Sequence, residues 1–342
     1  MNKIKNTLFS NKPVTINENS IIMALESSCD ETACAIVKGG REVLANVVAS
    51  QIKTHEEYGG VIPEIAARMH LEAVNVVVEE AFKQAGLKGD DITAFAGTVG
   101  PGLVGCLLVG MNAAKSLALA YDKPFIGINH LNAHLAANFI DTDLEPPFIA
   151  LLVSGGHTQI IEMNSYSDIN IIGETIDDAV GEAYDKVARL IGLPYPGGPK
   201  LDKMAQEGNP FAFKLPEAKV DGFNFSFSGL KTAVLRLVKS FDGKDLPVAD
   251  ICASFQECVS STLLKKVKKA AEEHCYKQIV LAGGVAANSE IRKKIFQLES
   301  EGYKVFAPPM KYCTDNAAMV ASAAYFFEKT FDKTDVEVFS RA

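Results

Sequence analysis

The sequence predicts an α/β protein made of two similar halves with a cleft between them. Apolar stretches of strand length alternate with longer stretches that carry apolar residues at helical spacing, which is the pattern of sheets flanked by helices. An arrangement of strand, small polar turn and second strand near residue 20 returns near residue 147, and this echo indicates an internal structural repeat. The length of 342 residues agrees with two domains, because single cores rarely exceed about 250–300 residues.

Composition and charge are those of a soluble globular protein: 48% of the residues are hydrophobic, 22% are charged and the formal net charge is −8. A negative chain has no overall attraction for nucleic acid, so contact with a polyanion requires a local basic patch or a helper protein. The seven cysteines form no C-x-x-C pair and are expected to be reduced thiols, which predicts a cytoplasmic location. The chain begins without the apolar core of a secretory signal, and no apolar stretch is long enough to predict a membrane span.

In the first half we expect three strands, a helix, a buried strand, a helix that opens at a glycine turn, and another strand, at 20–27, 32–40, 41–51, 62–87, 91–99, 100–121 and 124–129. The last strand leads into a helix that starts at His130. The helix at 62–87 is predicted from apolar residues at helical spacing: Ile65, Met69, Val76, Val77 and Ala81.

The second half is expected to hold a strand–turn–strand unit, a helix, a loop rich in proline and glycine, a long loop, a helix, a strand–turn–helix unit and a closing helix, at 147–163, 179–193, 194–205, 208–234, 250–274, 277–297 and within 305–327. These assignments divide the chain into three parts. They are a polar extension at 1–19, an N-terminal lobe at 20–146 that the last helix at about 316–330 joins, and a C-terminal lobe at 147–315.

Three turns that follow buried strands contain the residue types of a phosphate-binding or catalytic site. Backbone N–H groups in such turns lack internal partners, and glycine allows a ligand to approach closely. The first turn, ESSCDET, holds hydroxyls and carboxylates, and Glu26 at the inner end of an apolar strand is unusual for a plain polar turn. The other two are the Gly-Gly turns in LLVSGGHTQI and LAGGVAAN. Each alone also suits an ordinary turn, and together they favour nucleotide binding.

The spacing G-x-G-x-x-G at Gly100, Gly102 and Gly105 matches a dinucleotide-binding turn. The acidic residue that should close the next strand is missing, because Asp122 precedes that strand and Asn129 ends it. Tight packing at the start of a helix is therefore the favoured explanation of these glycines.

His130 and His134 lie four residues apart on a predicted helix, so both imidazoles share one face and can reach one ion. A pair of surface histidines gives the same pattern, and both interpretations stay open on these residues alone. Leu131 occupies the place of the glutamate that H-E-x-x-H metalloproteases use as general base, which argues against proteolysis. A third ligand, an Asp or Glu, has to come from elsewhere in the chain.

Other polar residues admit two interpretations each. Asp315, at the start of an alanine-rich helix, is either a helix cap or a carboxylate returned to the cleft. His55 and His70 have no partner nearby in the sequence and are expected to be structural or exposed. The lysines of LLKKVKKAAEEH suit a solvated helix face, with an RNA contact as the alternative.

Segments spread from residue 20 to about residue 327 resemble, in order, the bacterial TsaD family of tRNA threonylcarbamoyladenosine transferases, once described as glycoprotein endopeptidases. The segments are MALESSCDETACAIV, HEEYGGVIPEIAARMH, GTVGPGLVGCLLVG, INHLNAHL, LLVSGGHTQI, EAYDKVAR, PYPGGP, NFSFSGLKTAV, DICASFQ, LAGGVAANSEIR and CTDNAAM. So many segments in one order are far more specific than any single motif.

The resemblance implies the two-lobed actin/sugar-kinase/Hsp70-like ATPase fold, which fits the duplicated halves. It also implies transfer of a threonylcarbamoyl group from threonylcarbamoyl-AMP to N6 of adenine 37 in tRNAs that read ANN codons, forming threonylcarbamoyladenosine. The alternative is an ATP-hydrolysing switch or kinase of the same fold, which would hydrolyse ATP without tRNA and would not need both histidines. A metalloprotease and a pure scaffold match the residues less well.

By resemblance, one divalent metal is held by His130, His134 and Asp315; iron or zinc is expected, and these ligands also suit magnesium. Asp30 and Glu31 correspond to acidic positions expected to act in catalysis, and Asp30 is the candidate that accepts the proton of the adenine amine. The residues expected to bind substrate are Val153, Ser154, Gly155, Gly156, His157, Asp185, Gly198, Asp202 and Asn288. Besides the donor, an ATP- or ADP-type nucleotide is expected to occupy the cleft.

The expected partners are tRNA and TsaB-like and TsaE-like proteins, with a functional link to the synthase that makes the adenylate. Two features depart from the family pattern: the N-terminal extension, and Cys34 and Cys106 at positions where small residues are common. Neither departure affects the predicted site.

Overall fold

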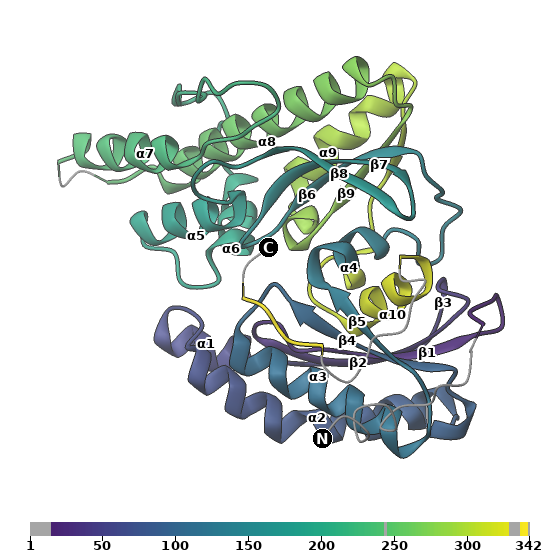
Figure 1. Ribbon diagram of the computed structural model, residues 1–342. Helices are drawn as coiled ribbons and strands as arrows, with labels where there is room; N and C mark the ends of the chain where they lie inside the picture. Colours follow the sequence, from purple (N-terminus) through teal and green to yellow (C-terminus); the bar gives the residue numbers. More distant parts are fainter. Residues whose placement is uncertain (1–14, 243–244, 328–335, 341–342) are drawn as a thin grey trace. The chain divides into compact units, whose positions relative to one another are not determined.

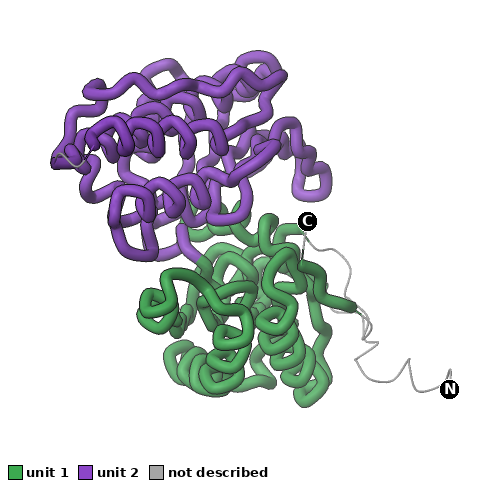
Figure 2. The backbone as a smooth tube through the Cα atoms, turned by 90° about the vertical axis from the view of Figure 1, so that its left-hand side faces the viewer, with its two compact units in different colours: residues 1–144, 315–342 green, residues 145–314 purple. Residues whose placement is uncertain are grey.

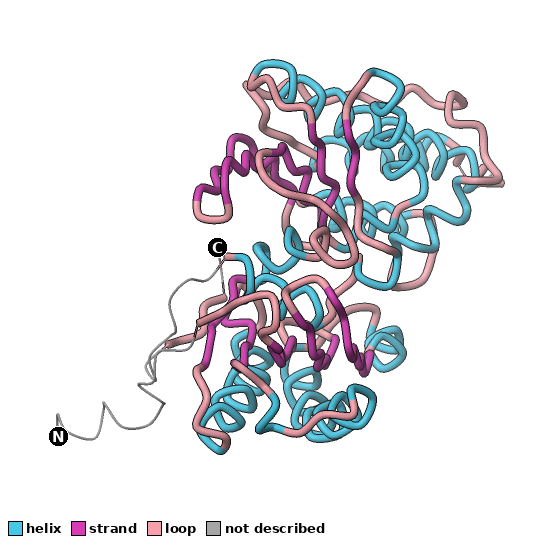
Figure 3. The backbone as a smooth tube through the Cα atoms, turned by 90° about the vertical axis from the view of Figure 1, so that its right-hand side faces the viewer, coloured by secondary structure: helices cyan, strands magenta, loops and turns pink. Residues whose placement is uncertain are grey.

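The computed structural model describes residues 15–242, 245–327 and 336–340. The chain divides into two compact units, which Figure 2 colours separately: unit 1 contains residues 1–144 and 315–342, and unit 2 contains residues 145–314. Each unit holds one five-stranded sheet flanked by helices (Figure 3). Most of the predicted polar extension, residues 1–14, lies outside the described residues.

The sheet of unit 1 has the order β3-β2-β1-β4-β5. Its strands are β1 (Ile21–Glu26), β2 (Glu31–Lys38), β3 (Glu42–Ser50), β4 (Ala94–Gly100) and β5 (Phe125–Asn129). The first three strands are antiparallel neighbours, whereas β4 and β5 run parallel to β1. The carboxyl ends of β1, β4 and β5 therefore meet at one edge of the sheet, which places the turn after β1 beside the residues that follow β4 and β5.

Helices cover both faces of this sheet, with α2 and α3 on one face and α4 and α10 on the other (Figure 1). The helical segments of unit 1 are α1 (Ile52–Tyr58), α2 (Pro63–Ala85), the short 3₁₀ turn η1 (Gly89–Asp91), α3 (Val104–Ala120), α4 (His130–Ala136) and α10 (Ala317–Phe326). Under α2 and α3 the core contains Leu25, Val77 and Phe95. Half of the residues of α10 are buried alanines, whose small side chains let the helix pack closely on α4 and β1.

The sheet of unit 2 repeats the topology of unit 1, with the order β10-β9-β6-β7-β8. Its strands are β6 (Phe148–Val153), β7 (Thr158–Ser165), β8 (Asp168–Glu174), β9 (Gln278–Ala282) and β10 (Lys304–Phe306). Again three consecutive strands are antiparallel, and two later strands run parallel to the first. The matching order and direction confirm the predicted duplication.

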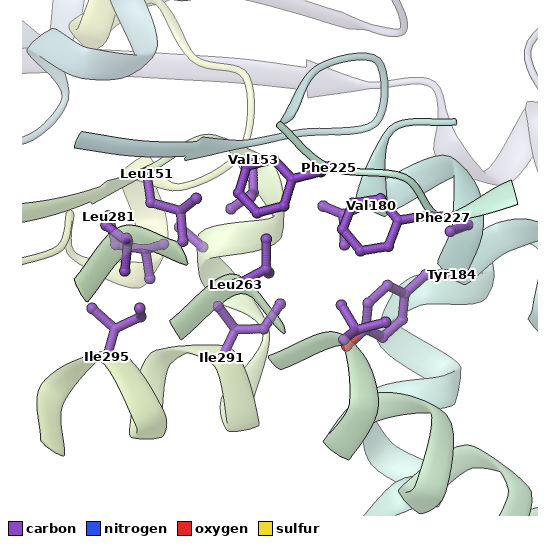
Figure 4. Packing of buried hydrophobic residues seen from close by; sticks show 14 of the residues in the cluster. Leu151, Val153, Val180, Tyr184, Phe225, Phe227, Leu263, Leu281, Ile291 and Ile295 are labelled. Carbon is purple, nitrogen blue, oxygen red and sulfur yellow. The ribbon is translucent and has the colours of Figure 1, made fainter. Parts of the chain in front are cut away.

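The helices of unit 2 enclose a large apolar core (Figure 4). They are α5 (Val180–Leu190), α6 (Gly197–Ala205), α7 (Ser228–Ser240), α8 (Val248–Glu273) and α9 (Ser289–Gln297), with the 3₁₀ turns η2 (Gly284–Ala287), η3 (Leu298–Glu301) and η4 (Met310–Tyr312). Leu151 and Leu281 of the sheet meet Leu263 of α8 and Ile291 of α9 in this core.

Some expected elements differ from the structure. The first predicted loop, at 194–205, contains α6, whose glycine-rich start is stabilised because Asp185 accepts the N–H groups of Gly197 and Gly198. The second predicted loop contains the start of α7, and the prediction missed α1, β8 and β10. The predicted apolar stripe of α2 is wrong at Val76, which is 64% exposed. The buried face of α2 instead consists of Ala66, His70, Val74, Val77 and Ala81.

Candidate functional site

The turn after β1 is held against the start of α3. The Ser27 hydroxyl donates to the carbonyl oxygen of Cys106 at 2.8 Å and accepts the N–H of Gly110 at 3.0 Å. A Cβ added to Gly102 would lie only 2.7 Å from the carbonyl oxygen of Ser28. The glycine motif before α3 thus permits this close approach, in agreement with a packing role.

His70 of α2 fixes the other side of the same turn. Its Nε2 lies 3.0 Å from the carbonyl oxygen of Cys29, and its Nδ1 lies 2.7 Å from Oγ1 of Thr32. A carbonyl oxygen can only accept, so Nε2 carries the proton and Thr32 donates to Nδ1. His70 and His55 are both fully buried, which supports their structural interpretation.

The turn delivers the two predicted catalytic carboxylates. Burial and the nearby Asp315 carboxylate raise the pKa of Asp30. Burial also raises the pKa of Glu31 to about 7, although the Ser50 hydroxyl donates to its Oε1 at 2.8 Å. A carboxylate with a raised pKa is a better general base near neutral pH. The structure therefore places two carboxyl groups with raised pKa values next to each other, at the end of the turn and the start of β2.

The three predicted metal ligands converge in unit 1. His130 and His134 lie one turn apart on α4, and their ring centroids are 4.6 Å apart. The Nε2 atoms of His130 and His134 lie 3.6 and 3.3 Å from Oδ1 of Asp315. One ligand atom from each of the three residues lies within 4.8 Å of the others.

These separations suit one metal ion. Two ligands about 2.1 Å from one ion at a tetrahedral angle lie roughly 3.4 Å apart, which is close to both nitrogen–oxygen distances. The donor set of two imidazoles and one carboxylate fits iron or zinc better than magnesium, which prefers oxygen ligands. Burial and Asp30 raise the pKa of the nearby Cys29 thiol, which disfavours its thiolate form.

The two helices next to the predicted metal ligands are capped by other residues, so the side chains of the ligands are not needed as caps. Asn129 caps α4, its Oδ1 accepting the N–H groups of Leu131 and Asn132. Asn316 caps α10 by accepting the N–H of Met319, so the cap is the residue after Asp315. The carboxylate of Asp315 is therefore available to the histidines, and the helix-cap interpretation of Asp315 is wrong.

Electrostatics favour a positive charge at the ligand set. Burial alone would lower the pKa of His130, but the carboxylates of Glu26 and Asp315 outweigh this effect and raise it to about 9. The same interactions lower the pKa of Asp315 and of Glu26 despite their burial. The negative potential of these carboxylates favours a positive charge here, which either a proton on His130 or a metal cation can supply.

Unit 2 contains a separate cavity of about 450 Å³. Five of the predicted substrate-binding residues line it: Gly155, Asp185, Gly198, Asp202 and Asn288. Four others, Val153, Ser154, Gly156 and His157, are not among its lining residues. The prediction did not include the lining residues Tyr184, Pro196, Val285, Met310 and Thr314. All except Met310 lie in segments that resemble the family, but their apolar or neutral side chains gave no reason to select them individually.

The turn at 154–157 borders open space. The N–H of Ser154 donates to the carbonyl oxygen of His157 at 2.8 Å, and the N–H of His157 donates to the Ser154 hydroxyl at 3.0 Å. A Cβ added to Gly155 or Gly156 would meet no atom within 4 Å. The glycines therefore leave room for a ligand next to the backbone.

Gln256 of α8 does not line the cavity but joins two lining residues, and it was not among the predicted site residues although it ends the segment DICASFQ. Its Nε2 donates to Asp202 at 2.9 Å, and its Oε1 accepts from Asn288 at 3.0 Å. Asp202 also accepts the N–H and the hydroxyl of Ser289 at 3.0 and 2.7 Å. The amide of Gln256 thus fixes the orientation of both side chains.

The lysines of α8 mostly form ion pairs. Lys265 pairs with Glu217 at 3.0 Å, and Lys269 with Glu273 at 3.5 Å. This agrees with a solvated helix face, and an RNA contact here stays a prediction. All seven cysteines lie in the described part of the chain and are free thiols. Within that part, every helix is too short or too polar to cross a membrane.

Comparison with known proteins gives the family. The family model TsaD, described as tRNA N6-adenosine threonylcarbamoyltransferase, matches residues 42–322. A protein of that name from Clostridium perfringens is 54% identical over 312 residues, covering 90% of this chain and 92% of the relative. The chain belongs to the TsaD family. A relative of the same name from Picosynechococcus is 51% identical, with 94% of each protein covered.

Membership of the TsaD family confirms the predicted transferase that forms threonylcarbamoyladenosine in tRNA and disfavours the switch or kinase alternative. Solved structures confirm the actin/sugar-kinase/Hsp70-like fold class. HypF from T. kodakarensis matches with a TM-score of 0.63 and 16% identity, covering 93% of this chain and 49% of that protein. Component A of (R)-2-hydroxyglutaryl-CoA dehydratase from Acidaminococcus fermentans matches with a TM-score of 0.51 and 16% identity, covering 90% and 97%.

Proposed function

We propose that this TsaD-family chain takes its threonylcarbamoyl group from threonylcarbamoyl-AMP and transfers it to N6 of adenine 37 in tRNAs that read ANN codons. The observation that carries this proposal is the convergence of His130, His134 and Asp315 in the unit that also holds the Asp30–Glu31 turn. One site thus combines a donor set for a Lewis acid with carboxylates of raised pKa. Each of these groups can accelerate acyl transfer to a weak amine nucleophile.

His130, His134 and Asp315 are proposed to hold one divalent cation, iron or zinc in first place. Such a cation can bind a donor oxygen, orient the donor and polarise its carbonyl, contributing several kcal/mol of charge stabilisation. Leu131 follows His130 where a zinc protease has its general base, so the ligand set lacks the group that would activate water for proteolysis.

Asp30 is proposed as the general base, with Glu31 as a second acidic group of the site. The adenine amine attacks the carbonyl carbon of the donor, a C–N bond forms, and the C–O bond to the phosphate of AMP breaks. The amine must lose a proton during this step, and a carboxylate with a raised pKa accepts it near neutral pH. AMP leaves with the bonding electrons.

The cavity of unit 2 is proposed to bind the nucleotide part of the donor, or an ATP- or ADP-type nucleotide. Its volume of about 450 Å³ falls in the usual range for small-molecule sites, and it combines apolar walls with Asp185, Asp202 and Asn288. Full-length HypF, which shares the fold with a TM-score of 0.61, is described in a phosphate- and nucleotide-bound form. The open turn at 154–157 suits a phosphate close to the backbone.

We also propose TsaB-like and TsaE-like partners, a functional link to the synthase that makes the adenylate, and a cytoplasmic location. The family resemblance supports the partners. The free thiols and the tRNA substrate support the location.

The test is reconstitution of tRNA modification with tRNA, threonine, bicarbonate, ATP and the proposed partners. The wild type is compared with His134→Ala and with His274→Ala, which removes an exposed histidine paired with Glu162 in unit 2. Mass spectrometry of the digested tRNA should show the modified nucleoside with the wild type and His274→Ala and at least a hundredfold less with His134→Ala. Equal modification by all three proteins would refute the proposed metal site.

A further inference from the structure

Glu26 is a buried carboxylate at the end of an otherwise apolar strand, and only 1% of its surface is exposed. Its Oε1 accepts the N–H of Ser28 at 2.5 Å. Its Oε2 accepts the hydroxyl of Thr98 at 2.7 Å and lies 3.1 Å from Nδ1 of His130. The proposed reaction assigns no role to this carboxylate.

The contact with His130 fixes the proton on the imidazole ring. An ionised carboxylate can only accept, so Nδ1 carries the hydrogen of the bond. In a neutral imidazole the other nitrogen, Nε2, then presents its lone pair. This nitrogen is the one that lies 3.6 Å from Oδ1 of Asp315.

We propose that Glu26 is a positioning residue of the metal centre, which holds His130 in the tautomer that binds the ion and balances the charge of a divalent cation. This inference rests on the metal site proposed above. Histidines that bind metals commonly donate their second N–H to a carboxylate, which orients the ring and strengthens its basicity. Glu26 and Asp315 together carry two negative charges, which matches a divalent ion held by neutral imidazoles.

The internal repeat shows that the fold itself does not require a carboxylate here. In unit 1, residues 22–25 of β1 pair in parallel with β4, and Glu26 is the next and last residue of the strand. In unit 2, residues 149–152 of β6 pair in the same way with β9, and Val153 is the next and last residue. Val153 is fully buried and apolar. The same place in the duplicated sheet therefore accepts valine, and a buried charge is otherwise costly.

The second histidine lacks such support. Within the described part of the chain, Nδ1 of His134 is buried and has no hydrogen-bond partner. Glu26 thus acts on one ligand only, and its loss should weaken metal binding through His130. Loss of an outer partner of this kind typically costs 10- to 100-fold in metal affinity.

The test measures zinc binding to metal-free protein by competition with a chromophoric chelator. Glu26→Gln keeps the shape of the side chain and removes its charge, and Glu26→Val copies unit 2. The matched control is Glu162→Gln, because Glu162 also contacts Nδ1 of a histidine, His274, at 3.0 Å, but both residues belong to unit 2 and the metal ligands to unit 1. We expect zinc affinity to fall about 10- to 100-fold in Glu26→Gln and further in Glu26→Val. The zinc affinity of Glu162→Gln should equal that of the wild type.

Cobalt absorption spectra and His134→Ala separate the possible failures. If Glu26 positions the metal ligand, the visible absorption bands of the cobalt-loaded Glu26→Gln protein should shift relative to the wild type. If Glu26 has only a structural role, the substitution changes the thermal midpoint of the metal-free protein. The cobalt bands and the zinc affinity then stay unchanged. If His134→Ala loses zinc binding while Glu26→Gln and Glu26→Val both bind zinc like the wild type, the role of Glu26 is refuted and the metal site stands. If His134→Ala also binds zinc normally, the metal site itself is refuted. Should Glu26→Val not fold, Glu26→Gln decides the outcome alone.

Discussion

Replacing Glu31 by glutamine is expected to stabilise the protein at pH 8 more than at pH 5. Burial favours the neutral form of this carboxyl and raises its pKa from 4.5 to about 7 in the folded chain. In the unfolded chain the group ionises at its ordinary pKa, so the folded state binds the proton more tightly. Ionisation therefore costs stability as the pH rises above 4.5, and the cost is complete above pH 7.

The size of the effect follows from the two pKa values. Linkage gives a cost of roughly 1 kcal/mol at pH 5 and roughly 3 kcal/mol at pH 8, which are upper bounds. Solvent access to a partly exposed side chain reduces the difference to about 1–2 kcal/mol. Glutamine keeps an oxygen that accepts the Ser50 hydroxyl, so the substitution removes the charge and retains the bond.

Urea unfolding at pH 5 and pH 8 measures this difference. The control is Glu72→Gln, which changes an exposed carboxyl on α2. The gain in unfolding free energy of Glu31→Gln over the wild type should rise by about 1–2 kcal/mol from pH 5 to pH 8, while Glu72→Gln changes by less than about 0.5 kcal/mol. A gain that is equal at both values, or that falls with rising pH, would refute the inference that burial penalises the charge on Glu31.

Two further substitutions test the packing around the two sites. Gly102→Ala should lower the free energy of unfolding by about 1–3 kcal/mol, because its Cβ would lie 2.7 Å from the carbonyl oxygen of Ser28; thermal or urea unfolding within about 0.5 kcal/mol of the wild type would contradict the close packing. Gln256→Leu should raise the KM for threonylcarbamoyl-AMP about tenfold with a smaller change in kcat, because Asp202 and Asn288 lose their shared partner. Initial rates that show an unchanged KM would mean that the orientation of these two side chains does not depend on Gln256.

The duplicated topology could be predicted because it leaves a local trace. A buried strand, a turn of small residues and a second strand are readable at 20–40 and again at 147–163, and both became the first two strands of a sheet. The helix α6 leaves no such trace, since it starts with Gly-Gly-Pro. Its stability depends on Asp185 in another helix, which accepts two of its first N–H groups.

The metal ligands, too, could be predicted from the local sequence only in part. His130 and His134 are neighbours on one helix, so their spacing alone predicted a shared face. Asp315 reaches them because α10 packs on α4, a tertiary contact that no local pattern reveals, and only the family resemblance selected it. Glu26 was unusual at the end of an apolar strand, but its partner His130 became evident only when the carboxyl ends of β1 and β5 met.

X-ray absorption at the zinc edge of the zinc-loaded protein can identify the metal ligands. We expect one zinc per chain with the multiple scattering of two imidazoles and only nitrogen or oxygen ligands. Zinc–sulfur scattering at about 2.3 Å, which would bring in the neighbouring Cys29, or a spectrum without imidazole features, would contradict the assignment of His130, His134 and Asp315 as the ligands.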